Sequence, residues 1–369
     1  MPTRSPLSAR DAVRIATHAS AADTDGWLHP VHRALIHKRG WLRMLAPRSV
    51  GGDERALPDV VRLEEALARV DGSVGWTVTL CAGAAWFTGF LPPHLARAIL
   101  STPRACLAGS GAPTGYADRA GDGWRIAGEW DYASGAPMAT HFTFNAWLRA
   151  DGRPLLDADG QPRMQAFVVP AEIVAIVPRW RSIGLRATAS HAYRIDGGWV
   201  HADHGFTIAP ACAREQGPLY RFPFLPFAFV TLAANVAGMA AHFVDLAHDC
   251  IARRRNRFGG GEPLIEVPAV RAALDGARAR LDDVRGRFYA LLDATWAEVA
   301  AGAEVADGQA AQMQALAQEW VAASRHAVDT LYPYCGLVAA SADSDINRVW
   351  RDFHTASQHA LLMPQGSHS

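Results

Sequence analysis

Apolar residues recur at helical spacing towards both ends of this 369-residue chain and alternate at strand spacing in its middle third. Residues 59–70 follow the helical period, with Glu64 and Glu65 expected on the solvent side, whereas residues 142–148 form a short aromatic-rich run bounded by turn residues. This order predicts an α+β protein in three parts: an N-terminal helical domain (1–105), a central β-domain (106–208) and a C-terminal helical domain (209–369).

Both helical parts contain segments expected to be buried. Residues 74–91 carry no charged side chain, and residues 227–247 are apolar and rich in alanine. A helix that is apolar on every side belongs in an interior. The long helices expected over residues 267–297 and 307–332, joined by a short loop, predict a four-helix bundle.

Charge and composition exclude several classes of function. The formal net charge is zero, from 36 basic and 36 acidic residues, so no excess positive charge attracts nucleic acid or anionic lipid. We find no run of about 18 apolar residues and expect no membrane-spanning helix. The first residues lack the apolar segment of a signal peptide, which favours a cytoplasmic protein. Five cysteines without metal-type spacing predict free thiols and no metal site.

Residues 107–135 form the most informative stretch. They begin with a run of small residues, 108–115, which cannot make a core but lets main-chain groups approach a flat ligand closely. Asp122-Gly123 indicates a hairpin turn, followed by a strand. That strand leads into residues 130–135, which place two aromatic rings and a hydroxyl group beside a glycine.

Two segments of this stretch resemble flavin-lining segments of the acyl-CoA dehydrogenase superfamily. The resemblance is to its flavin-dependent monooxygenase branch, which includes dibenzothiophene monooxygenase and the oxygenase component of p-hydroxyphenylacetate hydroxylase. That branch has G-S-x-x-P-x-G and G-R-W-x-F-x-S-G where this chain has GSGAPTG (109–115) and GEWDYASG (128–135). Residues 180–191, WRSIGLRATASH, are similar to a third segment that shapes the wall near the cofactor. The resemblance implies a β-barrel-like domain between a helical domain and a four-helix bundle.

The resemblance also implies which residues bind the flavin, FMN or FAD. Ser134 would hydrogen-bond the flavin at N5, and Tyr132 would pack on the ring. The first segment would contribute Ser110, Gly111 and Thr114. Arg257 and Phe258, in a segment like R-x-x-F-G, would reach the phosphates or adenosine of a flavin in a neighbouring subunit, since an arginine fork suits phosphate and phenylalanine offers a stacking face.

The C-terminal segment departs from the dehydrogenases of the superfamily. Their motif R-D-x-x-x-x-x-x-Y-E-G contains the glutamate base, and counting from Arg351-Asp352 places Ala360 at that position. Alanine cannot accept a proton. The monooxygenase branch has a histidine near the flavin here, which implies that His359 is catalytic together with Ser134, because imidazole can hold or pass a proton at neutral pH. From spacing alone, His359 is better interpreted as an ordinary core or surface histidine.

The resemblance predicts the oxygenase component of a two-component monooxygenase. It would receive reduced flavin from a separate reductase and act with O2, through a C4a-hydroperoxyflavin, on a small apolar or aromatic substrate. The alternatives are an acyl-CoA dehydrogenase-like flavoprotein oxidising a C–C or C–N bond, and a non-catalytic flavin-binding or assembly protein. Ala84 stands where phenol hydroxylases of the branch have a histidine that orients the substrate, which argues against phenol hydroxylation. Residues 332–336 depart from the Q-x-x-G-G segment that binds the adenosine of FAD, and this departure favours FMN. Dimers of dimers in the family imply a homotetramer.

Overall fold

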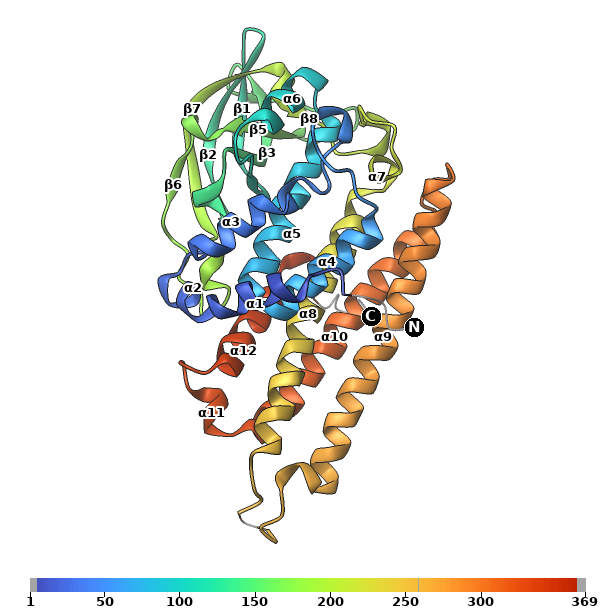
Figure 1. Ribbon diagram of the computed structural model, residues 1–369. Helices are drawn as coiled ribbons and strands as arrows, with labels where there is room; N and C mark the ends of the chain where they lie inside the picture. The colour runs from blue at the N-terminus through green and yellow to red at the C-terminus, as the bar shows by residue number, and fades with distance from the viewer. Residues whose placement is uncertain (1–4, 258, 364–369) are drawn as a thin grey trace.

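The computed structural model describes residues 5–257 and 259–363, with a β-sheet at one end of the molecule and long helices at the other (Figure 1). Ser8 and Asp71 cap two of the N-terminal helices, because their side chains accept hydrogen bonds from main-chain N–H groups of the first turn. The helices of this part are α1 (Ala9–Thr17), α2 (Ala19–Asp25), α3 (Pro30–Lys38), α4 (Leu57–Val70), α5 (Gly72–Trp86) and α6 (Pro93–Ser101).

The described strands form one mixed sheet with the order β6-β7-β2-β1-β3-β5-β8, and β4 pairs with β3. β1 and β3 are parallel, and the turn after Ala120 makes the predicted hairpin between β1 and β2. Large buried side chains, Trp130 and Tyr193 among them, give the sheet a core of its own. The strands are β1 (Leu107–Ala120), β2 (Gly123–Ala133), β3 (His141–Ala150), β4 (Arg153–Pro154), β5 (Met164–Pro170), β6 (Ala175–Val177), β7 (His191–His201) and β8 (Gly205–Phe206).

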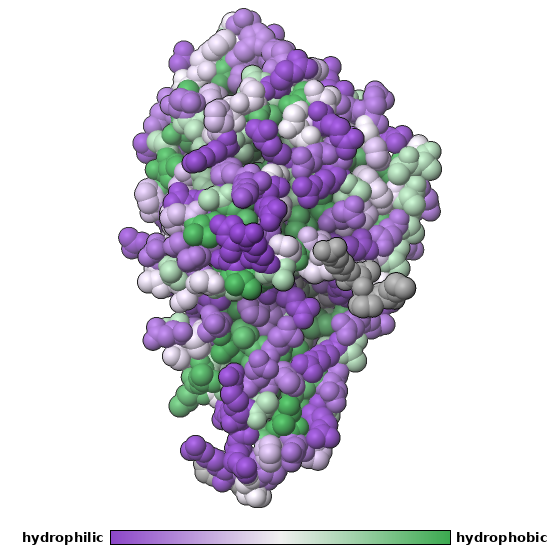
Figure 2. Space-filling model, in the orientation of Figure 1, coloured by the Kyte–Doolittle hydropathy of each residue, from purple (hydrophilic) through white to green (hydrophobic). Residues whose placement is uncertain are grey.

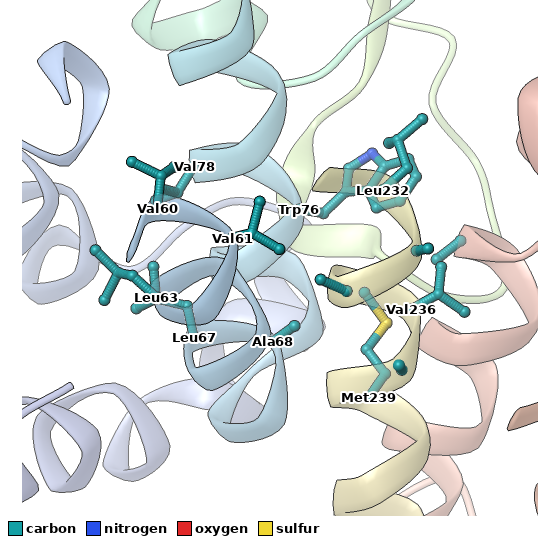
Figure 3. Close-up of a cluster of buried hydrophobic side chains, with 14 of the residues drawn as sticks. Val60, Val61, Leu63, Leu67, Ala68, Trp76, Val78, Leu232, Val236 and Met239 are labelled. Carbon is teal, nitrogen blue, oxygen red and sulfur yellow. The ribbon is translucent and has the colours of Figure 1, made fainter. Parts of the chain in front are cut away.

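The C-terminal part is helical: α7 (Pro218–Arg221), α8 (Phe224–Ala252), α9 (Pro268–Ala300), α10 (Asp307–Cys335), α11 (Leu337–Ala340) and α12 (Asp345–Ala356). α8 packs on α10, α12 and α4, so one hydrophobic core runs through both helical parts. Figure 3 shows this core where α4, α5 and α8 meet, with Val61, Trp76 and Val236 contributed by the three helices in turn. The predicted order of helices, strands and helices is therefore confirmed.

α8 corrects one expectation. It is long and apolar enough to cross a membrane, although we expected no such segment. In the folded chain, 83% of its most apolar window is buried, against helices on several sides. α8 is therefore a core helix of the folded chain, and its apolar surface is covered by protein.

The prediction that Glu64 and Glu65 face solvent is wrong. α4 packs against α8, α5 and α9, so a face that looked polar in the sequence is covered, and Glu64 is fully buried. Glu65 forms an ion pair with Arg285 (Oε1 to Nε, 2.6 Å) and accepts a hydrogen bond from Tyr289 Oη (2.7 Å). Burial raises the pKa of Glu64 to about 8.

We predict that Glu64→Gln stabilises the protein increasingly as pH rises. Because the folded-state pKa of about 8 lies above the ordinary value of 4.5, ionisation of Glu64 opposes folding between these values, by at most about 1.4 kcal/mol per pH unit. Glutamine keeps the shape and cannot ionise. In urea denaturation, the advantage of the variant should grow from pH 5 to pH 8 and level off above. An advantage that does not change with pH would contradict a buried, neutral Glu64.

Candidate active site

Strand β1 opens into a wide bulge at the run of small residues. β1 pairs with β3 as far as Ser110 and again from Gly115, while only Asn145 of β3 lies between the two partners. Pairing of β1 with β2 begins only at Tyr116. The main chain of residues 111–114 is thus outside both ladders, and its polar groups can face a ligand.

The bulge carries the predicted cofactor residues Ser110, Gly111 and Thr114. A side chain added at Gly111 would meet no atom within 4 Å, so the space beside this residue is open. Thr114 Oγ1 donates to the carbonyl of Glu129 at 2.6 Å, and Asn145 Nδ2 donates to the carbonyl of Gly111 at 2.7 Å, which ties the bulge to β2 and β3. The structure therefore groups these three residues; their contact with a flavin remains a prediction.

Tyr132 projects from the end of β2 in a strained conformation. Its φ of +68° is left-handed, and the ladder with β7 shifts register between Trp130 and Ala133. Trp130 is consequently fully buried, whereas Tyr132 is 71% exposed and stands edge-on to Trp180 at 6.2 Å between ring centroids. The exposed ring is available to a ligand, as its predicted role requires.

Ser134 follows at the end of the same strand and is buried. Its Oγ lies 2.9 Å from Ser190 Oγ, and its carbonyl accepts a weak hydrogen bond from Cys81 Sγ at 3.5 Å. Ser190 belongs to the third segment singled out in the sequence, between η6 (Arg186–Thr188) and β7. Two segments of the predicted flavin wall therefore meet at Ser134.

His359 lies beyond the last long helix of the chain. α12 ends at Ala356, and His359 instead caps the short helix η10 (Ala360–Leu362), because its Nδ1 accepts from Leu361 N at 3.3 Å. This hydrogen bond assigns the proton of the neutral ring to Nε2. The half-buried ring stands edge-on to Trp76 at 5.9 Å between centroids, and burial lowers the pKa of His359.

Helix α5 joins the serine and histidine sides of the site. Trp76 contacts His359, while the next turn of α5 faces the end of β2, where a side chain added at Gly135 would lie 3.2 Å from Thr77 and 3.1 Å from Cys81. In Figure 1, α5 runs from the sheet into the helical part of the molecule. The two predicted catalytic residues, one from the central sheet and one from the C-terminal part, therefore both lie against helix α5.

α12 holds the loop that precedes η6, a contact that no local sequence pattern predicts. Asp352 Oδ1 accepts from Leu185 N at 2.5 Å, and Arg351 donates to the carbonyl of Ile183 while pairing with Asp23 at 2.7 Å. A side chain at Gly184 would overlap the main chain of Arg351. Burial, and then the nearby carboxylate of Asp71, raise the pKa of Asp352 to about 7.

Arg257 lies far from this site within one chain. It is exposed in the loop between α8 and α9, at the end of the molecule opposite the sheet (Figure 1). Phe258 lies outside the described residues. Arg253 and Arg254, rather than Arg257, line a cavity of about 620 Å³ between the ends of α8, α10 and α12. Within one chain, Arg257, predicted to bind the flavin phosphates or adenosine, is therefore not brought together with Tyr132 and Ser134, which are predicted to contact the flavin ring.

Comparison with known proteins gives matches over most of the chain. Residues 230–364 match the family model described as acyl-CoA dehydrogenase, C-terminal domain. A pigment production hydroxylase of Rhodococcus erythropolis is 28% identical over 343 residues, covering 88% of this chain and 84% of the relative. The oxygenase component of FADH(2)-dependent resorcinol hydroxylase from Rhizobium sp. is 25% identical over 347 residues, covering 90% and 83%.

Solved structures share the fold. The HsaA monooxygenase from M. tuberculosis superposes with a TM-score of 0.88 at 22% identity, covering 98% of this chain and 94% of that one. XiaF from Streptomyces sp., solved with FADH2 and glycerol, gives a TM-score of 0.86 at 20% identity, covering 96% and 89%. The chain thus has the acyl-CoA dehydrogenase-like fold. Its relatives include a pigment production hydroxylase and the oxygenase component of an FADH(2)-dependent hydroxylase, and this similarity identifies the chain as an oxygenase component of a flavin-dependent two-component monooxygenase.

The residues of the site fit a reduced flavin. The bulge at 111–114 offers main-chain polar groups beside open space, and Ser134, whose carbonyl contacts Cys81 of α5, offers a hydroxyl group. On α5, the buried Thr77 Oγ1 has no hydrogen-bond partner among the described residues. A planar, polar-edged ring matches this combination of groups.

Proposed function

We propose that this oxygenase takes reduced flavin from a separate reductase and, with O2, transfers one oxygen atom to a small apolar or aromatic substrate. The observation that carries the proposal is the half-buried His359 against Trp76, one residue before Ala360, where dehydrogenases of the superfamily have their glutamate. The hydroxylases and monooxygenases among the relatives support the same class of reaction.

Each group of the site has a proposed task. Bound reduced flavin supplies the activation of O2. The main chain of residues 111–114 would hold the polar edge of the ring, and Ser134 would hydrogen-bond N5. His359 is neutral at pH 7 because burial lowers its pKa, and its Nε2–H would hold a proton beside the ring. Trp76 would keep water away from that proton.

The dehydrogenase alternative lacks a glutamate at both positions from which members of the superfamily take their base. Ala360 cannot accept a proton. Some family members take the glutamate from an earlier helix of this domain, but α8, which matches that helix, contains no glutamate. Glu64 is a glutamate near α5, but it is fully buried and closed to a substrate. The absence of an accessible carboxylate at these positions favours oxygenation over α,β-desaturation.

We also propose that the enzyme acts in the cytoplasm as a homotetramer. Leu337 and Val338 of α11 are 89% and 50% exposed beside the cavity lined by Arg253 and Arg254. Figure 2 shows apolar residues gathered on the part of the surface where α11 lies in Figure 1. A second subunit over this face would bury them and bring Arg257 towards a neighbouring flavin. Light scattering of the purified protein should give the mass of four chains; the mass of one chain would contradict this.

The function is tested with reduced flavin and labelled oxygen. Protein that binds FMNH2 or FADH2 without O2 is mixed with 18O2 and a panel of phenols, indoles and aromatic sulfides. We expect one 18O atom in the product of at least one aromatic class, detected by mass spectrometry. Reduction of bound oxidised flavin by an acyl-CoA, without any oxygenated product, would instead establish the dehydrogenase. Failure to bind flavin in either redox state would leave only the non-catalytic alternative.

A further inference from the structure

Three buried hydroxyl groups form a hydrogen-bonded chain that ends at Ser134. Ser134 Oγ lies 2.9 Å from Ser190 Oγ, which lies 2.6 Å from Thr188 Oγ1. Thr188 Oγ1 in turn donates to the carbonyl oxygen of Leu185 at 2.8 Å. All three hydroxyl residues are at most 5% exposed, so water does not compete for these groups.

The carbonyl at the far end fixes the direction of the chain. A carbonyl oxygen can only accept, so the single hydroxyl proton of Thr188 is used at Leu185. Ser190 must then donate to Thr188, and Ser134 must donate to Ser190. Three protons serve three hydrogen bonds, and Ser134 keeps only lone pairs for a ligand.

The main chain around Thr188 keeps this arrangement in place. Leu185 and Ala189, on either side of η6, adopt left-handed φ values of +50° and +44°. Leu185 N donates to the buried carboxyl of Asp352 at 2.5 Å, and Gly135 N donates to the carbonyl of Thr188 at 2.8 Å. The loop is therefore tied both to α12 and to the residue that follows Ser134.

Reduced and oxidised flavin differ at the atom that Ser134 would contact. N5 of reduced flavin carries a hydrogen and donates, whereas N5 of oxidised flavin has only a lone pair and accepts. We infer that Thr188 and Ser190 are positioning residues that make Ser134 a hydrogen-bond acceptor, so that the site selects reduced over oxidised flavin at N5. The inference rests on the proposed function, specifically on contact between Ser134 and N5. Reversing the chain would lose one hydrogen bond, equivalent to roughly three- to tenfold in affinity.

Ser190→Ala and Thr188→Val test the inference by breaking the chain at two points. Either change leaves Ser134 free to donate its proton to oxidised flavin. Dissociation constants for oxidised FMN and FAD, and for the reduced forms measured without O2, give the ratio of oxidised to reduced affinity for each protein. In both variants, we expect the preference for reduced flavin to fall roughly threefold to tenfold. A tenfold fall lowers the two-electron potential of the bound flavin by about 30 mV.

Ser134→Ala provides the control. In that background, adding Ser190→Ala should leave the ratio unchanged, because the group that the chain orients is gone. Circular dichroism of each variant confirms that it is folded. If both Ser190→Ala and Thr188→Val kept the wild-type ratio of oxidised to reduced flavin affinity, the inference would be overturned, whereas the proposal that the protein binds flavin would be unaffected. A wild-type protein that binds neither redox state of FMN or FAD would overturn the proposed function and this inference together.

Discussion

Replacement of His359 by alanine is expected to divert O2 from product to hydrogen peroxide. The variant loses the Nε2–H that we place beside the flavin and the hydrogen bond from Leu361 N to Nδ1, while Trp76 remains. Removal of a proton-holding group from a reacting centre typically slows the chemical step by about 10²-fold or more. Transfer of oxygen to the substrate then becomes slower than release of hydrogen peroxide into solution. The measurement is the ratio of product to hydrogen peroxide in a single turnover of bound reduced flavin.

His354→Ala is the matched control for this experiment. His354 lies five residues earlier, but its Nε2 faces Asp329 of α10 at 3.2 Å and its ring packs on Trp350, away from Trp76. We expect His354→Ala to keep the wild-type ratio of product to hydrogen peroxide. We also expect His359→Ala to bind reduced flavin with near wild-type affinity. If His359→Ala still converted O2 to product as efficiently as the wild type, the role assigned to His359 would be wrong.

Gly184→Ala is expected to lower both stability and flavin affinity. A methyl group at this position would overlap the main-chain carbonyl of Arg351, so α12 or the loop before η6 must move. Such overpacking typically costs about 1–3 kcal/mol. The movement would also break the hydrogen bond between Leu185 N and Asp352, and with it the support of Thr188 and Ser190. Urea denaturation and titration with reduced flavin measure the two effects.

A second glycine provides the comparison for this substitution. Gly276 is solvent-exposed and lies well inside helix α9, away from both ends, where an added methyl group meets no atom within 4 Å. Gly276→Ala should therefore stabilise the protein by about 0.5–1 kcal/mol and leave flavin affinity unchanged, because alanine is the better helix former. Equal stability of Gly184→Ala and the wild type would mean that the loop is not clamped by α12.

The sequence predicted the layout of the molecule because each part had a strong local pattern. Helical spacing, strand alternation and the Asp122-Gly123 turn are properties of short segments, and the structure confirms them. The bulge on β1 falls within the small-residue run, for which the sequence predicted only close approach of the main chain to a flat ligand. Ser134 and His359 were named through family resemblance, and their roles remain predictions.

Other features depend on contacts between distant segments and left no local signal. Glu64 looked solvent-facing because periodicity shows one apolar face, yet other helices cover the remaining sides of α4. The end of α12 at Ala356, before His359, is not marked by glycine or proline. The contact between Asp352 and Leu185 joins residues 167 positions apart. The sequence shows that Thr188 and Ser190 carry hydroxyl groups, but it does not predict that these groups form a hydrogen-bonded chain with Ser134.

The most direct test of the account is a crystal structure of the enzyme with reduced flavin, prepared without O2. We predict that the ring lies against residues 111–114, with Ser134 Oγ within about 3.5 Å of N5 and the His359 ring beside the same flavin. A flavin ring bound elsewhere, for example in the cavity at the ends of α8 and α10, would contradict the account. So would a ring in the predicted place with His359 turned to bulk solvent.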